Sequence, residues 1–90
     1  MTAYRWRAAD DVTGRLTGHA AEVVEVLAPP EEWADQSLQD PWLRGRIFGA
    51  SIGLSVAGTD REEVEQLRAL AAALAAAATN GGIVTLEREP

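Results

Sequence analysis

The chain has 90 residues, a formal net charge of −6 and a hydrophobic fraction of 47%, which together predict one folded domain over residues 1–90. It contains no cysteine, so disulfides, thiolate catalysis and cysteine-ligated zinc are excluded. The negative charge argues against nucleic acid as a partner, and no apolar run reaches the length that crosses a bilayer. No segment has the pattern of a signal peptide, so we expect a cytoplasmic protein without a membrane partner.

The first predicted element is a strand near residues 3–8. Tyr4 and Trp6 alternate with two arginines, and strict alternation is the pattern of a half-buried strand. The arginines would lie on the solvent side, where charge discourages unwanted strand pairing. We therefore expect this strand at an edge of the sheet.

Residues 12–28 allow two interpretations. Apolar residues recur at intervals of three and four, which favours a helix near 18–28 with Thr17 as its N-cap. The β-branched valines of this segment favour instead a hairpin in which residues 12–16 pair with residues 22–27. Two glycines in the segment would weaken a longer helix by about 1 kcal/mol each. We favour the shorter helix and keep the hairpin as the alternative.

Residues 29–45 carry two helix-start signals but no long periodic run. In the second signal Asp40 precedes Pro41, and an acidic cap followed by proline at the first helical position is typical of a helix start. We expect one or two short turns that lie over the core and are anchored by Trp33 and Trp42.

The second half of the chain has the clearest pattern. From residue 46 to 56 apolar residues alternate with small or polar ones, which predicts a strand. Asp60 or Thr59 can cap a helix near 60–78 that has glutamates in its first turn, and Asn80 or Gly81 can end it. A further strand is predicted near 83–88. A right-handed crossover through the helix would make this strand parallel to the first.

The predicted fold class is α+β. We expect a two-layer sandwich in which a small mixed sheet is packed by the long alanine-rich helix and by a second, shorter helix. The expected strands lie near 3–8, 46–56 and 83–88, and the expected helices lie near 18–28 and 60–78.

The predicted strand over residues 46–56 is rich in small residues. Gly45, Gly49 and Gly53 are spaced four apart, a spacing that lets helices pack closely in membranes. The two-residue alternation fits a strand better, with a small face that admits a close neighbour such as a helix, a second subunit or a ligand. An ordinary sheet face under a helix would show the same pattern. The candidate contact residues on this face are Gly49, Ser51, Gly53 and Ser55.

Groups that could carry chemistry are few. His19 is the only histidine, and only carboxylates could join it at a metal, so we expect it on the solvated surface and expect neither a metal nor a cofactor. The turn before Asp60 has a single glycine and is followed by acids that would repel phosphate. No serine or threonine stands in a nucleophile motif. We therefore assign no catalytic residue.

These observations favour a small acidic interaction protein, an adaptor or regulatory subunit that binds another protein or pairs with itself as a homodimer. The alternative is a small-molecule-binding domain or small enzyme, because arginines beside aromatic rings suit an anionic or planar ligand. Nucleic-acid binding is least favoured, since it would need the arginines of residues 5–7 and 44–46 in one positive patch. The cleft of the alternative would be lined by Trp33, Trp42, Arg44 and Arg46.

Overall fold

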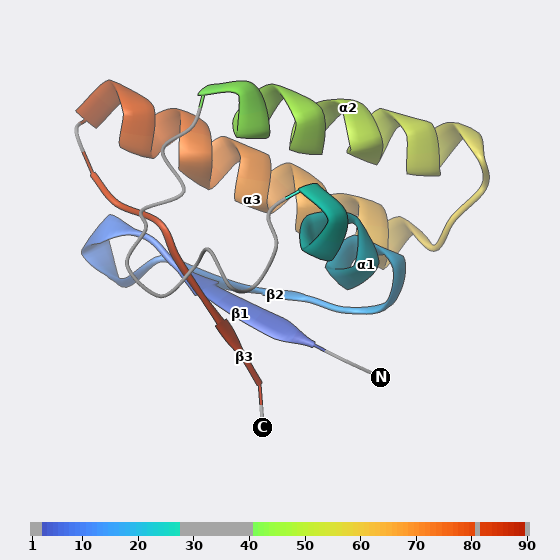
Figure 1. Cartoon of the computed structure of the whole chain (residues 1–90), viewed down its shortest axis with the longest axis horizontal. Helices are drawn as coiled ribbons and strands as arrows, with labels where there is room; N and C mark the ends of the chain where they lie inside the picture. The colour runs from blue at the N-terminus through green and yellow to red at the C-terminus, as the bar shows by residue number, and fades with distance from the viewer. Residues whose placement is uncertain (1–2, 28–40, 81, 90) are drawn as a thin grey trace.

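The computed structural model describes residues 3–27, 41–80 and 82–89, apart from the side chains of Asp10, Pro41 and Trp42. Trp33 and the first of the two expected helix starts lie outside the described residues. The fold is α+β, with helices gathered on one side of a small sheet (Figure 1). In chain order the elements are β1 Tyr4–Arg7, a short 3-10 helix Ala9–Asp11, β2 Thr13–Leu16, α1 Gly18–Leu27, α2 Pro41–Val56, α3 Arg61–Asn80 and β3 Thr85–Arg88.

The sheet is antiparallel throughout, with the order β2-β1-β3. Tyr4 pairs with Leu16 of β2 and with Arg88 of β3, so β1 is the central strand and its predicted edge position is wrong. The predicted mixed sheet, in which a crossover makes two strands parallel, is also wrong, because both neighbours of β1 pair with it antiparallel. Antiparallel strands need only a tight connection, and β1 and β2 are joined by the short 3-10 helix. The chain then returns from α3 to pair β3 with the other side of β1.

The largest correction concerns residues 46–56, which form the helix α2 and not a strand. Pro41 occupies the first helical position, as the second helix-start signal predicts. Leu43, Ile47 and Ser51 recur every four residues and are buried, which is the helical period. Apolar residues also lie on the opposite side of this helix, so the combined sequence alternates and resembles a strand.

The long helix is confirmed as α3. Its cap is Asp60, whose Oδ1 accepts a hydrogen bond from the backbone N–H of Glu62 at 2.8 Å. The helix runs to Asn80, two residues beyond the predicted end. Its buried residues recur at helical spacing: Val64, Leu67, Leu70, Ala71, Ala73 and Leu74.

The helical interpretation of residues 18–28 is confirmed by α1, which begins just after Thr17. The hairpin of residues 12–16 with 22–27 is wrong, because the latter residues are helical. Its first half is nevertheless a strand, β2, which pairs with β1. The valines of α1 are tolerated because Val24 is fully buried, and tertiary burial outweighs the small helix penalty of a β-branched side chain.

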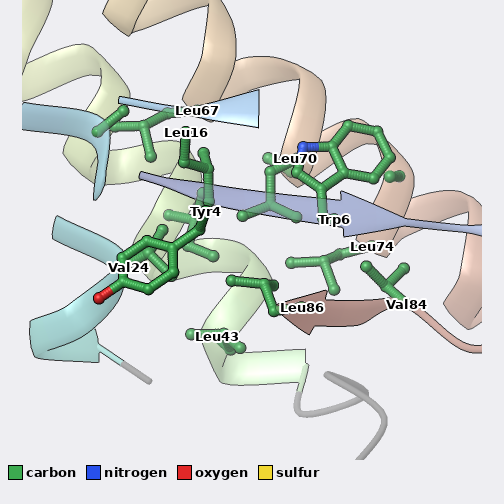
Figure 2. Close-up of a cluster of buried hydrophobic side chains, with 14 of the residues drawn as sticks. Tyr4, Trp6, Leu16, Val24, Leu43, Leu67, Leu70, Leu74, Val84 and Leu86 are labelled. Atoms are coloured by element: carbon green, nitrogen blue, oxygen red, sulfur yellow. The ribbon is translucent and has the colours of Figure 1, made fainter. Parts of the chain in front are cut away.

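The core lies between the sheet and the helices (Figure 2). Tyr4 extends from β1 toward α1, and the Trp6 indole extends toward α3 (Figure 2). The Tyr4 hydroxyl donates to the Glu25 carboxylate. Burial of the phenol, helped by this acceptor, raises the pKa of Tyr4. The other large core side chains come from β2, the three helices and the segment that contains β3: Leu16, Val24, Leu43, Ile47, Leu67, Leu70, Leu74, Val84 and Leu86.

The opposite side of the sheet, called here the open sheet face, carries charged and hydroxyl side chains. Arg15 forms a fork with the Glu89 carboxylate, with Nε to Oε1 at 2.9 Å and Nη2 to Oε2 at 2.8 Å. The Nη2 of Arg5 lies 3.6 Å from the same carboxylate. Hydrogen bonds from Arg15 hold the pKa of Glu89 below its usual value. The exposed strand residues of this face are Arg5, Arg7, Thr13, Arg15, Thr85 and Glu87.

Candidate interaction surface

The side of α2 that points away from the core is apolar and uncharged. Residues four apart lie on the same side of a helix, so burial of Leu43 and Ile47 directs the intervening residues outward. Phe48 is 52% exposed, Ile52 is 47% exposed and Val56 is 83% exposed. This surface, called here the α2 outer face, consists of Gly45, Phe48, Gly49, Ile52, Gly53 and Val56.

The glycines of the α2 outer face are not required by the packing of the chain itself. A Cβ atom added at Gly45, Gly49 or Gly53 would meet nothing within 4 Å. Each glycine inside a helix costs about 0.5–1 kcal/mol relative to alanine. All three residues therefore weaken α2 without relieving any contact within the described chain. What they provide is bare backbone that another surface can approach closely.

Charge is confined to one end of α2. Arg44 and Arg46 lie beside the α2 outer face, near the start of the helix, and both are exposed. The first turn holds no acidic residue and the last turn holds no basic residue. The helix dipole, positive at the N-terminus and negative at the C-terminus, is therefore uncompensated by charges of α2 itself.

Two apolar grooves border the α2 outer face and widen it. The groove toward α1 has a volume of about 480 Å³ and is lined by Val23, Val26, Leu27 and Ala50 together with the charged Glu22 and Arg46. Val26 in this groove is 80% exposed. The groove toward α3 has a volume of about 400 Å³. Its lining includes Arg44, Gly45, Phe48, Ala71, Ala72 and Ala75. The apolar surface therefore spans three helices.

The predicted small-residue face is divided by the helix. Residues two apart in an α-helix point to nearly opposite sides, so Gly49 and Gly53 lie on the α2 outer face while Ser51 is buried. The Ser51 hydroxyl donates to the Phe48 carbonyl oxygen at 2.6 Å. Ser55 is exposed near the end of the helix. The flat face of alternating glycine and serine does not exist.

The predicted cleft lined by tryptophans and arginines is only partly covered by the described residues. Trp33 lies outside them, as does the side chain of Trp42. Arg44 and Arg46 line different grooves on the two sides of α2, so these two side chains do not converge on one cavity.

The four arginines considered for nucleic-acid binding are separated by the fold. Arg5 and Arg7 lie on the open sheet face, whereas Arg44 and Arg46 project from α2 on the helical side (Figure 1). The sheet and α3 stand between the two pairs, so they do not form one positive patch.

His19 is exposed, as the sequence indicates, but it has a partner that the sequence did not reveal. Its backbone N–H donates to Glu63 Oε1 at 3.0 Å, and its ring Nδ1 lies 3.3 Å from Glu63 Oε2. Glu63 thereby ties the start of α1 to the first turn of α3. Within residues 3–27, 41–80 and 82–89, no group of three metal-ligating side chains is found.

The sequence interpretation missed the apolar members of this surface. Phe48, Ile52 and Val56 were placed among the apolar positions of a strand and were not named as candidates, and they are exposed on α2. The signal that identifies them is the four-residue spacing of the glycines, which continues in these apolar residues. Across the described parts of the chain, no helix is long and apolar enough to cross a membrane.

No protein-family model, characterised protein or solved structure matches this chain. The interpretation of the α2 outer face therefore depends on its own geometry, exposure and charge.

Proposed function

We propose that the protein is a small acidic interaction protein of the cytoplasm, an accessory or regulatory subunit that pairs with a second copy of itself through the α2 outer face. The observation that carries the proposal is an uncharged face of three glycines and three exposed apolar side chains on one helix. Exposed apolar patches of this kind typically mark protein interaction sites.

The charge distribution of α2 favours a second copy in an antiparallel arrangement. In that arrangement Arg44 and Arg46 of each protomer approach the C-terminal end of the partner's α2, where the dipole is negative and no basic residue compensates it. A parallel pair would bring the arginines of both protomers together. An antiparallel pair also places the same face on both sides of a twofold axis, as a closed homodimer requires.

The size of the contact surface supports the use of both flanking grooves. The 16 residues of α2 extend about 24 Å, and a standard interface buries about 800 Å² on each partner. One helix face is small for that area. The grooves toward α1 and α3 extend it, and exposed Val26 at their outer limit supplies further apolar area.

The test is the oligomeric state, measured by sedimentation velocity over a range of concentrations. We expect a dimer that Ile52→Glu dissociates, raising the dissociation constant about a hundredfold or more, because the glutamate would be buried without a partner. Gly49→Leu should dissociate it as well, since the leucine prevents close approach. Ile83→Glu is the matched control, because Ile83 is 55% exposed but lies outside α2.

Circular dichroism of each variant verifies that the monomer remains folded. The proposal fails if the protein is monomeric at the highest concentration, or if Ile52→Glu and Ile83→Glu have equal effects.

Whether the two α2 helices pair antiparallel or parallel can be tested separately with introduced cysteines, because the chain has no cysteine of its own. With a twofold axis near Gly49, position 45 of one protomer lies beside position 53 of the other. A mixture of Gly45→Cys and Gly53→Cys proteins should then form a disulfide-linked heterodimer under mild oxidation. Linked homodimers of each single variant would indicate a parallel pair.

A further inference from the structure

A third apolar groove lies between β2 and α3 and includes no residue of α2. Its volume is about 650 Å³. Residues 12–15 and the Trp6 indole line it on the strand side, and Ala69, Ala72 and Ala76 line the helix side. The small alanine side chains leave the groove wide. It shares only Ala72 with the groove toward α3 that flanks the α2 outer face.

The strand side of the groove is a sheet edge, because β2 is terminal in the order β2-β1-β3 of the described sheet. Hydrogen-bonded and non-bonded pairs alternate along an antiparallel ladder. The Ala8 N–H donates to the Val12 carbonyl oxygen at 2.7 Å, which sets that alternation. The N–H and C=O groups of Thr13 and Arg15 therefore point away from β1. These backbone groups are what an added strand would bind.

The groove also holds a polar atom without a partner. Trp6 is only 3% exposed, and its Nε1 has no hydrogen-bond acceptor among the described residues. The indole lies over Gly14, where an added Cβ would come within 2.5 Å of the ring. The absence of a side chain at Gly14 leaves room for the indole, and Trp6 is part of the lining of the groove. Buried donors of this kind are normally satisfied.

The helix-side rim of the groove is acidic. Glu65 pairs with Arg68 at 3.3 Å, whereas the carboxylate of Glu62 has no ion pair within 4.0 Å among the described residues. An added segment with a basic side chain near the start of α3 would pair with Glu62. The overall charge of −6 attracts a basic segment as well.

We propose that this groove binds an extended, basic segment of a partner protein, which adds to the sheet as a strand beside β2. Its backbone pairs with the outward groups of Thr13 and Arg15. Alternate side chains, small and apolar, enter the groove against the alanines, and an acceptor of the segment reaches the Trp6 N–H. A lysine or arginine of the segment pairs with Glu62.

The probe is a displayed library of random peptides, selected against the full chain. We expect the enriched peptides to alternate apolar and polar residues and to contain a lysine or arginine. A synthetic enriched peptide is then titrated and followed by proton–nitrogen correlation NMR. The Thr13 and Arg15 amides and the Trp6 indole N–H should shift, and hydrogen exchange of the two amides should slow at least about tenfold, because hydrogen bonding protects them.

Two sets of variants separate strand addition from other binding. The same peptide with N-methyl groups at the backbone nitrogens that pair with β2 should bind at least about tenfold more weakly, and this comparison leaves the protein unchanged. Thr13→Pro should weaken binding similarly, because it removes the outward N–H of residue 13. Proline is tolerated at an edge position whose N–H does not bond within the sheet. Ala69→Phe should fill the groove and block binding, whereas Ala78→Phe, exposed on the same helix, should not.

The proposal is overturned if no peptide is enriched, or if N-methylation has no effect. Peptide-induced shifts confined to Phe48 and Ile52 would also overturn it, because they would assign binding to the α2 outer face. If the Thr13 and Arg15 amides become more protected from hydrogen exchange as the protein concentration rises, without peptide, a second copy of the chain occupies the β2 edge. Dissociation of the homodimer by Ile52→Glu should leave peptide binding intact, so the two proposals can fail separately.

Discussion

The α2 outer face and the open sheet face are both turned toward solvent, yet they are built in opposite ways. On the sheet, arginines and glutamates bind one another, and Glu89 is held between Arg15 and Arg5. On the α2 outer face, Phe48 and Ile52 stand between glycines, and none of the residues of that face is charged. Arg5, Arg15 and Glu89 of the sheet face pair with one another, whereas the α2 outer face leaves apolar area in water. That difference indicates which surface gains most from a partner.

The largest expected effect tests the orientation of α2. Ile47→Ala should lower the free energy of unfolding by about 2–5 kcal/mol, because Ile47 is fully buried. Ile52→Ala on the opposite side of the helix should change it by less than about 0.5 kcal/mol in the monomer. Urea unfolding at low protein concentration measures both. Similar losses for the two variants would mean that the α2 outer face belongs to the core.

Replacement of Gly14 and of Gly49 by alanine should change the free energy of unfolding in opposite directions. Gly14→Ala brings a Cβ within 2.5 Å of the Trp6 ring and should cost about 1–3 kcal/mol of unfolding free energy. Gly49→Ala, with open space around it, should stabilise the monomer by about 0.5–1 kcal/mol. Thermal and urea unfolding of both variants provides the comparison. In a double-mutant cycle, Trp6→Leu should reduce the cost of Gly14→Ala, and an unchanged cost would contradict the assigned contact.

The smallest expected effect concerns the ion pairs of the open sheet face. The pKa of Glu89 is lower in the folded chain than its usual value of 4.5. The unfolded state therefore binds the proton first as the pH falls. The stability contributed by Glu89 is present above pH 4.5 and is lost as the pH falls through the folded pKa. As the pH falls from about 6 to 3, the free energy of unfolding should decrease more steeply for the native chain than for Glu89→Gln.

High salt provides the control for this pH effect, because exposed ion pairs are screened. The difference between the native chain and Glu89→Gln should shrink in about 1 M salt. A difference that is unchanged by salt would point to a cause other than the Arg15 and Arg5 pairs. No comparable salt dependence is expected for variants of the uncharged α2 outer face.

Local signals in the sequence identified most elements of the fold. Asp60 and the glutamates after it fixed the start of α3, and Pro41 fixed the start of α2. Alternation around Tyr4 and Trp6 identified β1. The residues after Arg46 were assigned to a strand because apolar side chains occupy both sides of the helix they form. A single sequence does not distinguish alternation on a strand from a helix that is apolar on its inner and outer faces.

The candidate surface was predicted in part for the same reason. Gly49, Gly53, Arg44 and Arg46 were selected from the sequence, and the structure places the two glycines on the α2 outer face and both arginines beside it. Phe48 and Ile52 were treated only as apolar positions of an alternating strand and not as contact candidates, since a sequence does not show which apolar residues are exposed. The pairing of His19 with Glu63 and of Arg15 with Glu89 joins residues far apart in the chain, which no local pattern predicts.

The sequence by itself determined the α+β class, the caps and the apolar content of each segment, because these depend on neighbours within a few positions. Tertiary structure alone decided that β1 is central, that the sheet is antiparallel and that one side of α2 remains uncovered. Those outcomes depend on which elements meet across the core. The described chain has enough apolar surface to bury Leu43 and Ile47 under α2, and nothing within it covers Phe48, Ile52 and Val56.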